Sequence, residues 1–359
     1  MVDAIRFLRL LGGILTCLAR VQQFDGRMHS PQTMTPAHLA AQPATRTQRN
    51  PSQHSSRYGF SMHWVSFCSF VLMLATASPA RTPADGPAAL TQPASGASLL
   101  ASPARSWAVD CASNEALVIQ HPGSFLRYRL HVIDEKGDHL RDQIETPEGS
   151  VARLIQSDGR PLTAAEDAAE RQHLNDLLAS PASFARHIHR EQENKQMGVN
   201  LLKLMPDAML WSYTAGQPQL PNQPSGDPAL IVLDFKPDPA WSPPTMEAEP
   251  LTGLEGRVWI DPRSRRMVRL EASLTRPVNI GWGIVAHLYP GGTVTLHQTS
   301  VGGQRWIVQH IVEQLNLRAL MFKTVHQRLV FDTADYQPVP AMSYQQAIKI
   351  LLDTPLPTR

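Results

Sequence analysis

The chain has 359 residues, with 33 Lys and Arg, 31 Asp and Glu and 14 His, which gives a formal net charge of +2 at pH 7. Because the basic residues are dispersed among the acids, the composition argues against a dedicated nucleic-acid surface. Two of the three cysteines, Cys17 and Cys68, fall in a leader-like region. A cleaved product would keep Cys111 alone and could form no internal disulfide, so packing must hold the fold.

Residues 1–61 are predicted to be disordered, or a mis-assigned segment upstream of the true start. Between Gly26 and Ala84 there is no Asp or Glu, and Gln, Ser, Thr, His and Pro are abundant. Such a composition buries too little apolar surface to offset the chain entropy lost on folding. The length of the chain would allow two domains, but a single domain of moderate size is favoured.

Residues 62–80 predict a secretory signal. The segment is uncharged and largely apolar from Trp64 onward, follows Arg57 and His63, and ends in small residues suited to cleavage. Because Met62 stands directly before the apolar run, we predict that translation begins there. The competing interpretation is a short membrane anchor, since about 17 residues is the lower limit for a spanning helix. We expect an exported protein, periplasmic or associated with the outer membrane.

Residues 81–110 form a predicted linker rich in Pro, Ala and Ser, and residues 111–359 a single domain that begins with strands. Residues 125–133 alternate apolar with basic side chains, which predicts an amphipathic strand. Turn residues then separate two further predicted strands, over 139–145 and 151–156.

Helices follow these strands. Thr163 and Glu166 have the spacing of a capping box, which predicts a helix over residues 164–178. A second helix is expected over residues 181–204, because Pro206 cannot donate the next helical hydrogen bond.

The rest of the chain has the pattern of an antiparallel meander. Asp261 and Pro262 favour a turn between two strands, and Val268 to Leu274 alternates apolar with polar residues, which predicts a hairpin with one wet face. Further strands are expected over residues 208–214, 230–235, 280–289, 293–301, 306–315 and 320–331, followed by a short helix over 344–352.

This order of elements predicts an α+β fold, in which a curved antiparallel β-sheet, an incomplete β-barrel, has helices packed on its concave face. Three segments carry a resemblance to a known family: Lys-Pro-Asp-Pro at 236–239, Gly-Arg-Val-Trp-Ile-Asp at 256–261 with the strand 268–271 after it, and the glycine turn before Trp306. Together they resemble exported bacterial proteins of the lipoprotein-sorting type, over roughly residues 125–331.

The resemblance implies a half-barrel closed by helices over a hydrophobic cavity, and a role in carrying acyl chains or sensing lipoproteins in the periplasm. It implies no catalytic residue. The candidate cavity wall consists of large apolar residues on the predicted sheet: Tyr128, Leu130, Trp211, Phe235, Trp259, Leu270, Trp282, Leu288, Trp306 and Phe322. A concave sheet face lined in this way is either core beneath helices or a wall that binds acyl chains through buried area.

Motifs for other chemistry have simpler interpretations. Residues 281–286 fit G-x-G-x-x-A, but a strand and turn follow where a dinucleotide site needs a helix. His173, His187 and His189 are interpreted as solvated helix polarity, because helical residues two apart point in nearly opposite directions. Acids at the start of the helix over 164–178 suit its dipole. We therefore expect no metal and no cofactor.

The favoured hypothesis is a non-enzymatic envelope protein that binds a lipid or an acylated lipoprotein in the cavity. A second hypothesis is an interaction module that docks another envelope protein and fills the cavity with its own side chains. A third is a hydrolase with an unrecognised site, which would need Asp, His and Ser gathered in one cleft.

Overall fold

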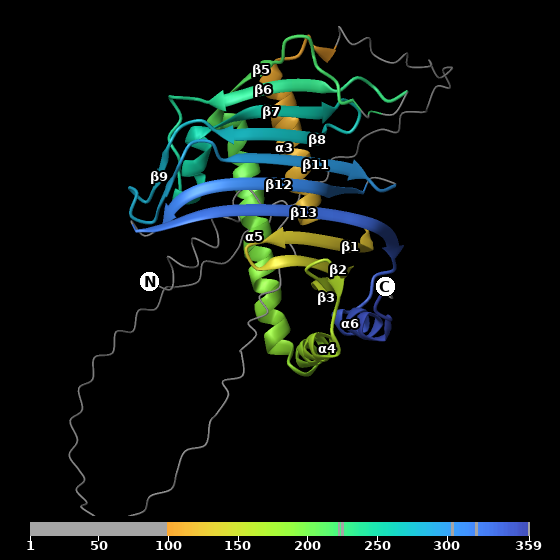
Figure 1. The fold of residues 1–359 in the computed structure, drawn as a ribbon. Coiled ribbons are helices and arrows are strands. Elements are labelled where there is room, and N and C mark those ends of the chain that lie inside the picture. The colour runs from red at the N-terminus through yellow and green to blue at the C-terminus, as the bar shows by residue number, and fades with distance from the viewer. Residues whose placement is uncertain (1–98, 222, 224–225, 303–304, 320–321, 358–359) are drawn as a thin grey trace, which may run out of the picture. The chain divides into compact units, whose positions relative to one another are not determined.

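A computed structural model describes residues 99–357 except 222, 224–225, 303–304 and 320–321. The predicted upstream segment, the signal and the linker up to residue 98 lie outside the described residues. Within the described part, 13 strands form one antiparallel sheet (Figure 1). They are β1 (Phe125–Asp134), β2 (Gly137–Thr146), β3 (Gly149–Ser157), β4 (Arg160–Pro161), β5 (Met209–Tyr213), β6 (Ile231–Pro237), β7 (Leu254–Asp261), β8 (Arg266–Leu274), β9 (Val278–Ile280), β10 (Ala286–Leu288), β11 (Thr293–Ser300), β12 (Trp306–Ala319) and β13 (Lys323–Val339).

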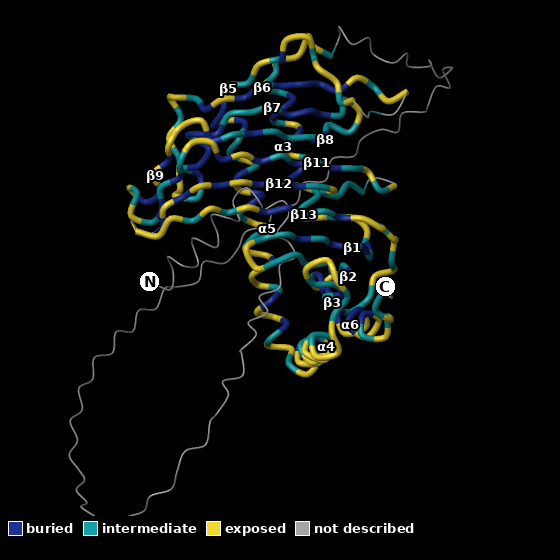
Figure 2. Tube along the Cα trace, viewed as in Figure 1, coloured by how far each residue is buried: buried dark blue, intermediate teal, exposed yellow. Residues whose placement is uncertain are grey.

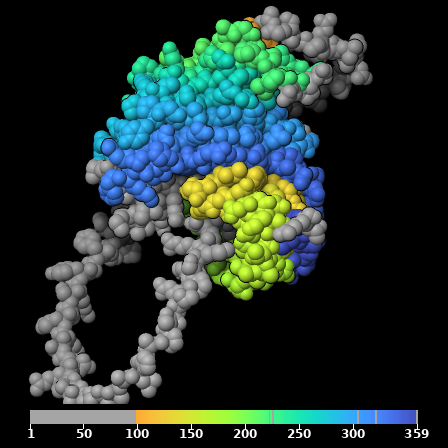
Figure 3. Space-filling model, viewed as in Figure 1, coloured from red at the N-terminus to blue at the C-terminus, as the bar shows by residue number. Residues whose placement is uncertain are grey.

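The strand order is β4-β3-β2-β1-β13-β12-β11-β8-β7-β6-β5, with β10 paired to β12 and to β9. The last strand, β13, therefore lies between β1 and β12 and joins the N-terminal strands to the meander. Figure 3 shows the N-terminal strands directly against this last strand. The sheet is curved and does not close, which confirms the predicted α+β fold with an incomplete barrel.

Four α-helices and one 3-10 helix accompany the sheet in the described residues: α3 (Ala104–Gln120), α4 (Ala164–Ala179), α5 (Pro181–Ala208), η2 (Met246–Gly253) and α6 (Tyr344–Asp353). The capping box of Thr163 and Glu166 is present, so the predicted start of α4 is confirmed. The predicted helix over 344–352 is also confirmed as α6, which has a capping box of its own.

Several predicted boundaries are wrong. β12 and β13 run past their predicted ends, to Ala319 and Val339. The fold begins before residue 111, because residues 104–110 of the predicted linker form the first turns of α3. Helix α5 continues past Pro206 to Ala208, where Arg105 of α3 donates a hydrogen bond to the Pro206 carbonyl (3.2 Å). The strand predicted over 280–289 is interrupted, since a turn over 281–285 separates β9 from β10.

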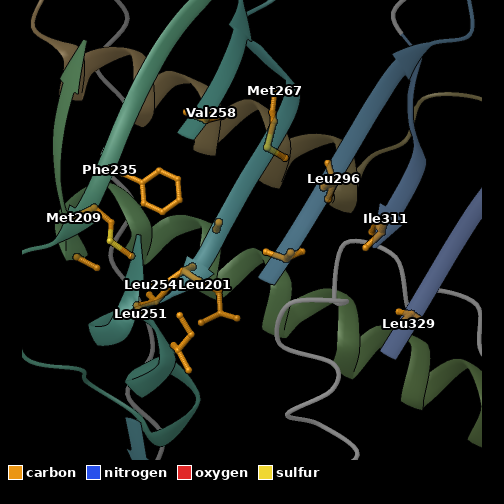
Figure 4. Packing of buried hydrophobic residues seen from close by; sticks show 14 of the residues in the cluster. Leu201, Met209, Phe235, Leu251, Leu254, Val258, Met267, Leu296, Ile311 and Leu329 are labelled. Atoms are coloured by element: carbon orange, nitrogen blue, oxygen red, sulfur yellow. The ribbon is translucent and has the colours of Figure 1, made fainter. Parts of the chain in front are cut away.

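The main hydrophobic cluster lies between one face of the sheet and the helices α3 and α5. Alternate residues of β1 point into it, and Figure 2 shows this alternation along the strands. The cluster includes Trp107 of α3 and Leu201 of α5. Figure 4 shows how residues of neighbouring strands meet there, among them Phe235, Val258, Met267, Leu296, Ile311 and Leu329.

The opposite face is also covered at the two ends of the sheet. Tyr128 pairs with Gln143 and its neighbour Arg127 pairs with Ile144, so Tyr128 and Ile144 point to opposite faces. Ile144 belongs to a second cluster with residues of α4, α6 and the start of α5. At the other end, the loop before β6 covers a third, small cluster around Trp259.

Gly256 of β7 marks a place where backbone and ring approach closely. It pairs with Phe235 and with Ala272, and the Phe235 ring packs at 5.3 Å from the Trp211 ring. A Cβ at residue 256 would lie 2.1 Å from the Glu271 carbonyl oxygen and 2.8 Å from the Phe235 ring. The glycine therefore lets the Phe235 ring and the β8 backbone approach β7 closely.

We expect Gly256→Ala to destabilise the protein by about 1–3 kcal/mol or more, because a neighbouring strand must move to admit the methyl group. The free energy of unfolding, measured by urea titration, checks this. Ser212→Ala on β5, in the same sheet, is the control, since Ser212 is exposed and the change is expected to stay within about 0.5 kcal/mol. Equal stability of the two variants would contradict the close contact between Gly256, the Glu271 carbonyl and the Phe235 ring.

Candidate binding site

Six of the ten predicted wall residues lie together in the main cluster. Tyr128, Leu130, Phe235 and Leu288 are buried, and the partly buried Trp211 and Leu270 pack against them. Large aromatic and aliphatic side chains on predicted strands were the signal that identified them, and the inner face of the sheet brings them together.

The other four wall residues lie elsewhere. Trp259 points to the outer face, where its indole N–H donates to the Pro218 carbonyl (2.8 Å) beneath the proline-rich loop. Trp282 and Phe322 are 94% and 81% exposed in turns beyond the ends of strands. Trp306 is half-buried and lines a second, more polar cavity. A one-residue step along a strand reverses the face, which apolar composition alone does not reveal.

An apolar cavity of about 70 Å³ lies between α3, α5 and the strands β7 and β8. Small residues of α3 leave this space open: Ala108, Cys111 and Ala112 line it on the helix side. Trp211 and Leu270 line it on the sheet side, as the sequence predicted. Burial raises the pKa of the Cys111 thiol well above its ordinary value, so the thiol stays protonated in this apolar environment.

A second cavity, of about 140 Å³, lies next to the first, and Glu115 lines both. Its wall mixes apolar groups with charged ones. The apolar groups include Ile119, Phe125 and Trp306, while Glu145 and Arg305 contribute charge. An apolar cavity and a more polar cavity therefore lie next to each other.

A buried ion pair separates the two cavities. The Arg266 guanidinium donates to both carboxylate oxygens of Glu115 (2.8 and 3.0 Å), and the Gln298 amide donates to the same carboxylate (2.9 Å). The Met267 backbone N–H adds a fourth donor (2.9 Å). All three side chains belong to buried residues, so α3 is fixed to β8 and β11 by a buried, hydrogen-bonded charge pair.

The polar cavity holds a second charge pair. Arg305 donates to Glu145 (2.7 Å), which also accepts the Leu126 backbone N–H (3.1 Å). Burial raises the pKa of Glu145, although Arg305 opposes the shift. The Arg305 Nε is buried without a hydrogen-bond partner, and Tyr128 lies on the same wall with a pKa raised well above its ordinary value by burial. An additional acceptor in the cavity would satisfy the Arg305 Nε.

Sequence reasoning missed Glu115, Arg266, Gln298, Glu145 and Arg305. Arg265 and Arg266 are neighbours in the sequence, yet Arg266 points inward while Arg265 stacks on the Trp107 ring at 3.7 Å. Helix α3 was placed in part in a linker, so no helical face was available to which Glu115 could be assigned. The charge pattern gave no signal for either pair.

One group resembles a catalytic arrangement but is structural. His187 and Glu191 of α5 approach Ser150, yet they contact its backbone: the Glu191 carboxylate accepts the Ser150 N–H (3.2 Å) and the His187 Nε2 lies 3.1 Å from the Ser150 carbonyl oxygen. His187 is buried, so its interpretation as solvated polarity was wrong, and burial lowers its pKa. The acids of α4 are likewise structural, since Asp167 pairs with Arg153 (2.7 Å).

Comparisons with models of known protein families, with curated proteins and with solved structures find no match to this chain. The resemblance to lipoprotein-sorting proteins therefore stays a prediction. Among residues 99–357, apart from the short gaps, no group of three or more His, Cys, Asp or Glu side chains is placed to hold a metal ion. No helix in the same part of the chain is long and apolar enough to cross a membrane.

We expect Glu115→Gln to destabilise the protein by about 3–5 kcal/mol, because Arg266 would remain buried without its counter-ion. Asp110→Asn is the control on the same helix, since the Asp110–Arg265 pair is half-exposed and contributes about 1 kcal/mol or less. Urea unfolding of both variants measures the difference. Equal losses would show that the Glu115 pair is not buried as described.

Proposed function

We propose that this protein is a non-catalytic binding protein that takes up the apolar tail of a lipid or an acylated protein between its sheet and helices α3 and α5. The observation that carries the proposal is the apolar cavity beneath α3, with a partly charged cavity beside it. An apolar tail gains about 0.8 kcal/mol for each CH₂ that it buries. The polar cavity would accept the part of the ligand that carries hydrogen-bond acceptors.

The size of the cavities bears on the mechanism. A cavity of about 150 Å³ holds a molecule the size of benzene, and the two cavities measure about 70 and 140 Å³. A longer acyl chain therefore requires α3 to move away from the sheet. The Glu115–Arg266 pair would resist this movement, and Ala108 and Ala112 offer little side-chain volume that would obstruct a tail beneath the helix.

The proposed location is the periplasm or the outer membrane. It rests on the apolar segment at residues 62–80 and on the resemblance to exported lipoprotein-sorting proteins. A binding site for apolar tails would be useful there, since lipids and acylated proteins cannot cross an aqueous compartment unaided.

The first test is native mass spectrometry of the protein purified gently from its own envelope, before and after extraction with organic solvent. We expect a mass excess that is removed with the lipid fraction, and binding of a fluorescent fatty-acyl probe by the extracted protein. A bare mass together with no affinity for the probe would refute the proposal.

The second test fills the apolar cavity. Ala112→Leu is expected to weaken probe binding about tenfold, because the new side chain takes the place of roughly two methylene groups of the ligand. Thermal stability should hold or rise, since the added group fills existing space. The matched control is Ser113→Leu, which adds the same side chain at an exposed position of α3. Unchanged affinity in the Ala112 variant would place the probe elsewhere.

A second candidate is an interaction module for another envelope protein, because six of the ten predicted wall residues pack within the main cluster. The terminal strand β5 has only β6 beside it in the strand order and exposes Leu210 (44%). Such an edge accepts an extended segment of a partner as an additional strand. This candidate would be favoured if native mass spectrometry showed the protein without bound lipid and if a co-purifying partner no longer bound the Ser212→Pro variant of β5.

A further inference from the structure

Two turns lie side by side at one end of the sheet. The turn over residues 281–285 connects β9 to β10, and β10 pairs with the end of β12 through Ala286 and Ala319. Phe322 follows shortly after, at the tip of the β12–β13 hairpin. Figure 1 shows the β9–β10 segment and this tip at the same end of the molecule. We call this region, defined by residues 281–285, Arg318, Phe322 and Lys323, the aromatic end.

The aromatic end has the two most exposed large apolar side chains of the described residues. Trp282 is 94% exposed and Phe322 is 81% exposed, and Ile284 adds a third at 55%. Elsewhere the most exposed is Leu117, at 56%. Single exposed apolar residues are common, but exposed aromatic and aliphatic side chains gathered on adjacent turns mark a contact surface.

The backbone holds Trp282 outward. Gly281, Trp282 and Gly283 all have positive φ (+56°, +55° and +80°), a conformation that a bulky residue adopts rarely. Hydrogen bonds fix the turn: the Gly283 N–H donates to the Ile280 carbonyl (3.1 Å), and the Gly281 N–H donates to the Glu249 carboxylate (3.0 Å). An ordered turn that exposes an indole in a strained conformation indicates a role outside the core.

The strands around these aromatic residues carry mainly positive charge. From Ala272 to Phe331 the sequence has a single acid, Glu313, which is fully buried. The exposed side chains of the β12–β13 hairpin include Arg318, Lys323 and Arg328. The nearby acids are Glu247 and Glu249 of η2, of which Glu249 accepts the Gly281 N–H of the turn. This end therefore offers positive charge beside its aromatic residues.

We propose that the aromatic end docks on an anionic lipid surface, with Trp282, Ile284 and Phe322 entering the interface and the basic residues contacting headgroup phosphates. Trp at such an interface places its ring at the level of the headgroups, and each nearby Lys or Arg adds electrostatic attraction. The apolar groups project singly from two turns. This shape suits a deformable lipid layer, whereas a protein partner would need a pocket for each side chain. The inference is independent of what the cavity binds.

The test uses the full chain with vesicles of phosphatidylcholine and phosphatidylglycerol, in which a fraction of the acyl chains is brominated to quench Trp emission on contact. The chain has seven Trp, so the difference between the wild type and Trp282→Phe isolates Trp282. We expect quenching that the variant lacks. Identical quenching of the two proteins would overturn the proposal, even if another segment attaches the chain to the vesicle.

A second variant tests the charges. Arg318→Gln with Lys323→Gln is expected to weaken the Trp282-dependent quenching about fivefold for each charge removed, and 0.5 M salt should weaken the wild type in the same way. Arg186→Gln with Arg190→Gln, two exposed positions on α5, is the matched control and should leave the titration unchanged. Equal effects of the two double variants would overturn the assignment of this end. Uptake of an acyl probe in solution should be the same in all variants, which separates this inference from the proposed function.

Discussion

The structure depends on the insertion of the last strand into the middle of the sheet. β13 pairs with β1 on one side and with β12 on the other, so Phe125 lies beside Val339 although more than half of the described chain separates them. Until β13 is in place, the N-terminal hairpins and the meander are two smaller sheets with free edges. Pairing of such distant segments loses considerable chain entropy, which the apolar inner face must offset.

A sheet that curves without closing leaves its apolar face to be covered, and here two helices from different parts of the chain cover it. α5 spans from the second cluster to the main one, while α3 depends on the Glu115 carboxylate for its position on β8 and β11. A charge pair has strict geometry, and the small residues of α3 do not fill the space next to it. The Glu115–Arg266 pair therefore fixes the position of α3 and also leaves the space beneath it incompletely packed. For this reason both cavities reach Glu115.

The sequence predicted what depends on local periodicity. The alternation in β1 and the capping box at Thr163 have short-range causes, and both elements formed where expected. Helix α3 was missed because Pro103 gives no side-chain cap and the helix is only weakly amphipathic. The burial of Arg266 and the outward position of Trp259 depend on strand register and on which loop covers the outer face. These are properties of the whole sheet, and a short segment of sequence does not determine them.

Trp282 shows how the same local pattern leads to opposite outcomes. Its surroundings, Gly-Trp-Gly followed by aliphatic residues, match a strand with an inward aromatic, and Trp306, which begins β12, also follows a pair of glycines and precedes aliphatic residues. The flanking glycines decide the outcome, because they allow three successive residues with positive φ, which end β9 and turn the indole to solvent. If Trp282 were to be buried, an ordinary extended backbone would be enough to point its side chain into the core. The strained turn is therefore a feature that stability of the core does not require, which is the physical argument for the proposed contact outside the core.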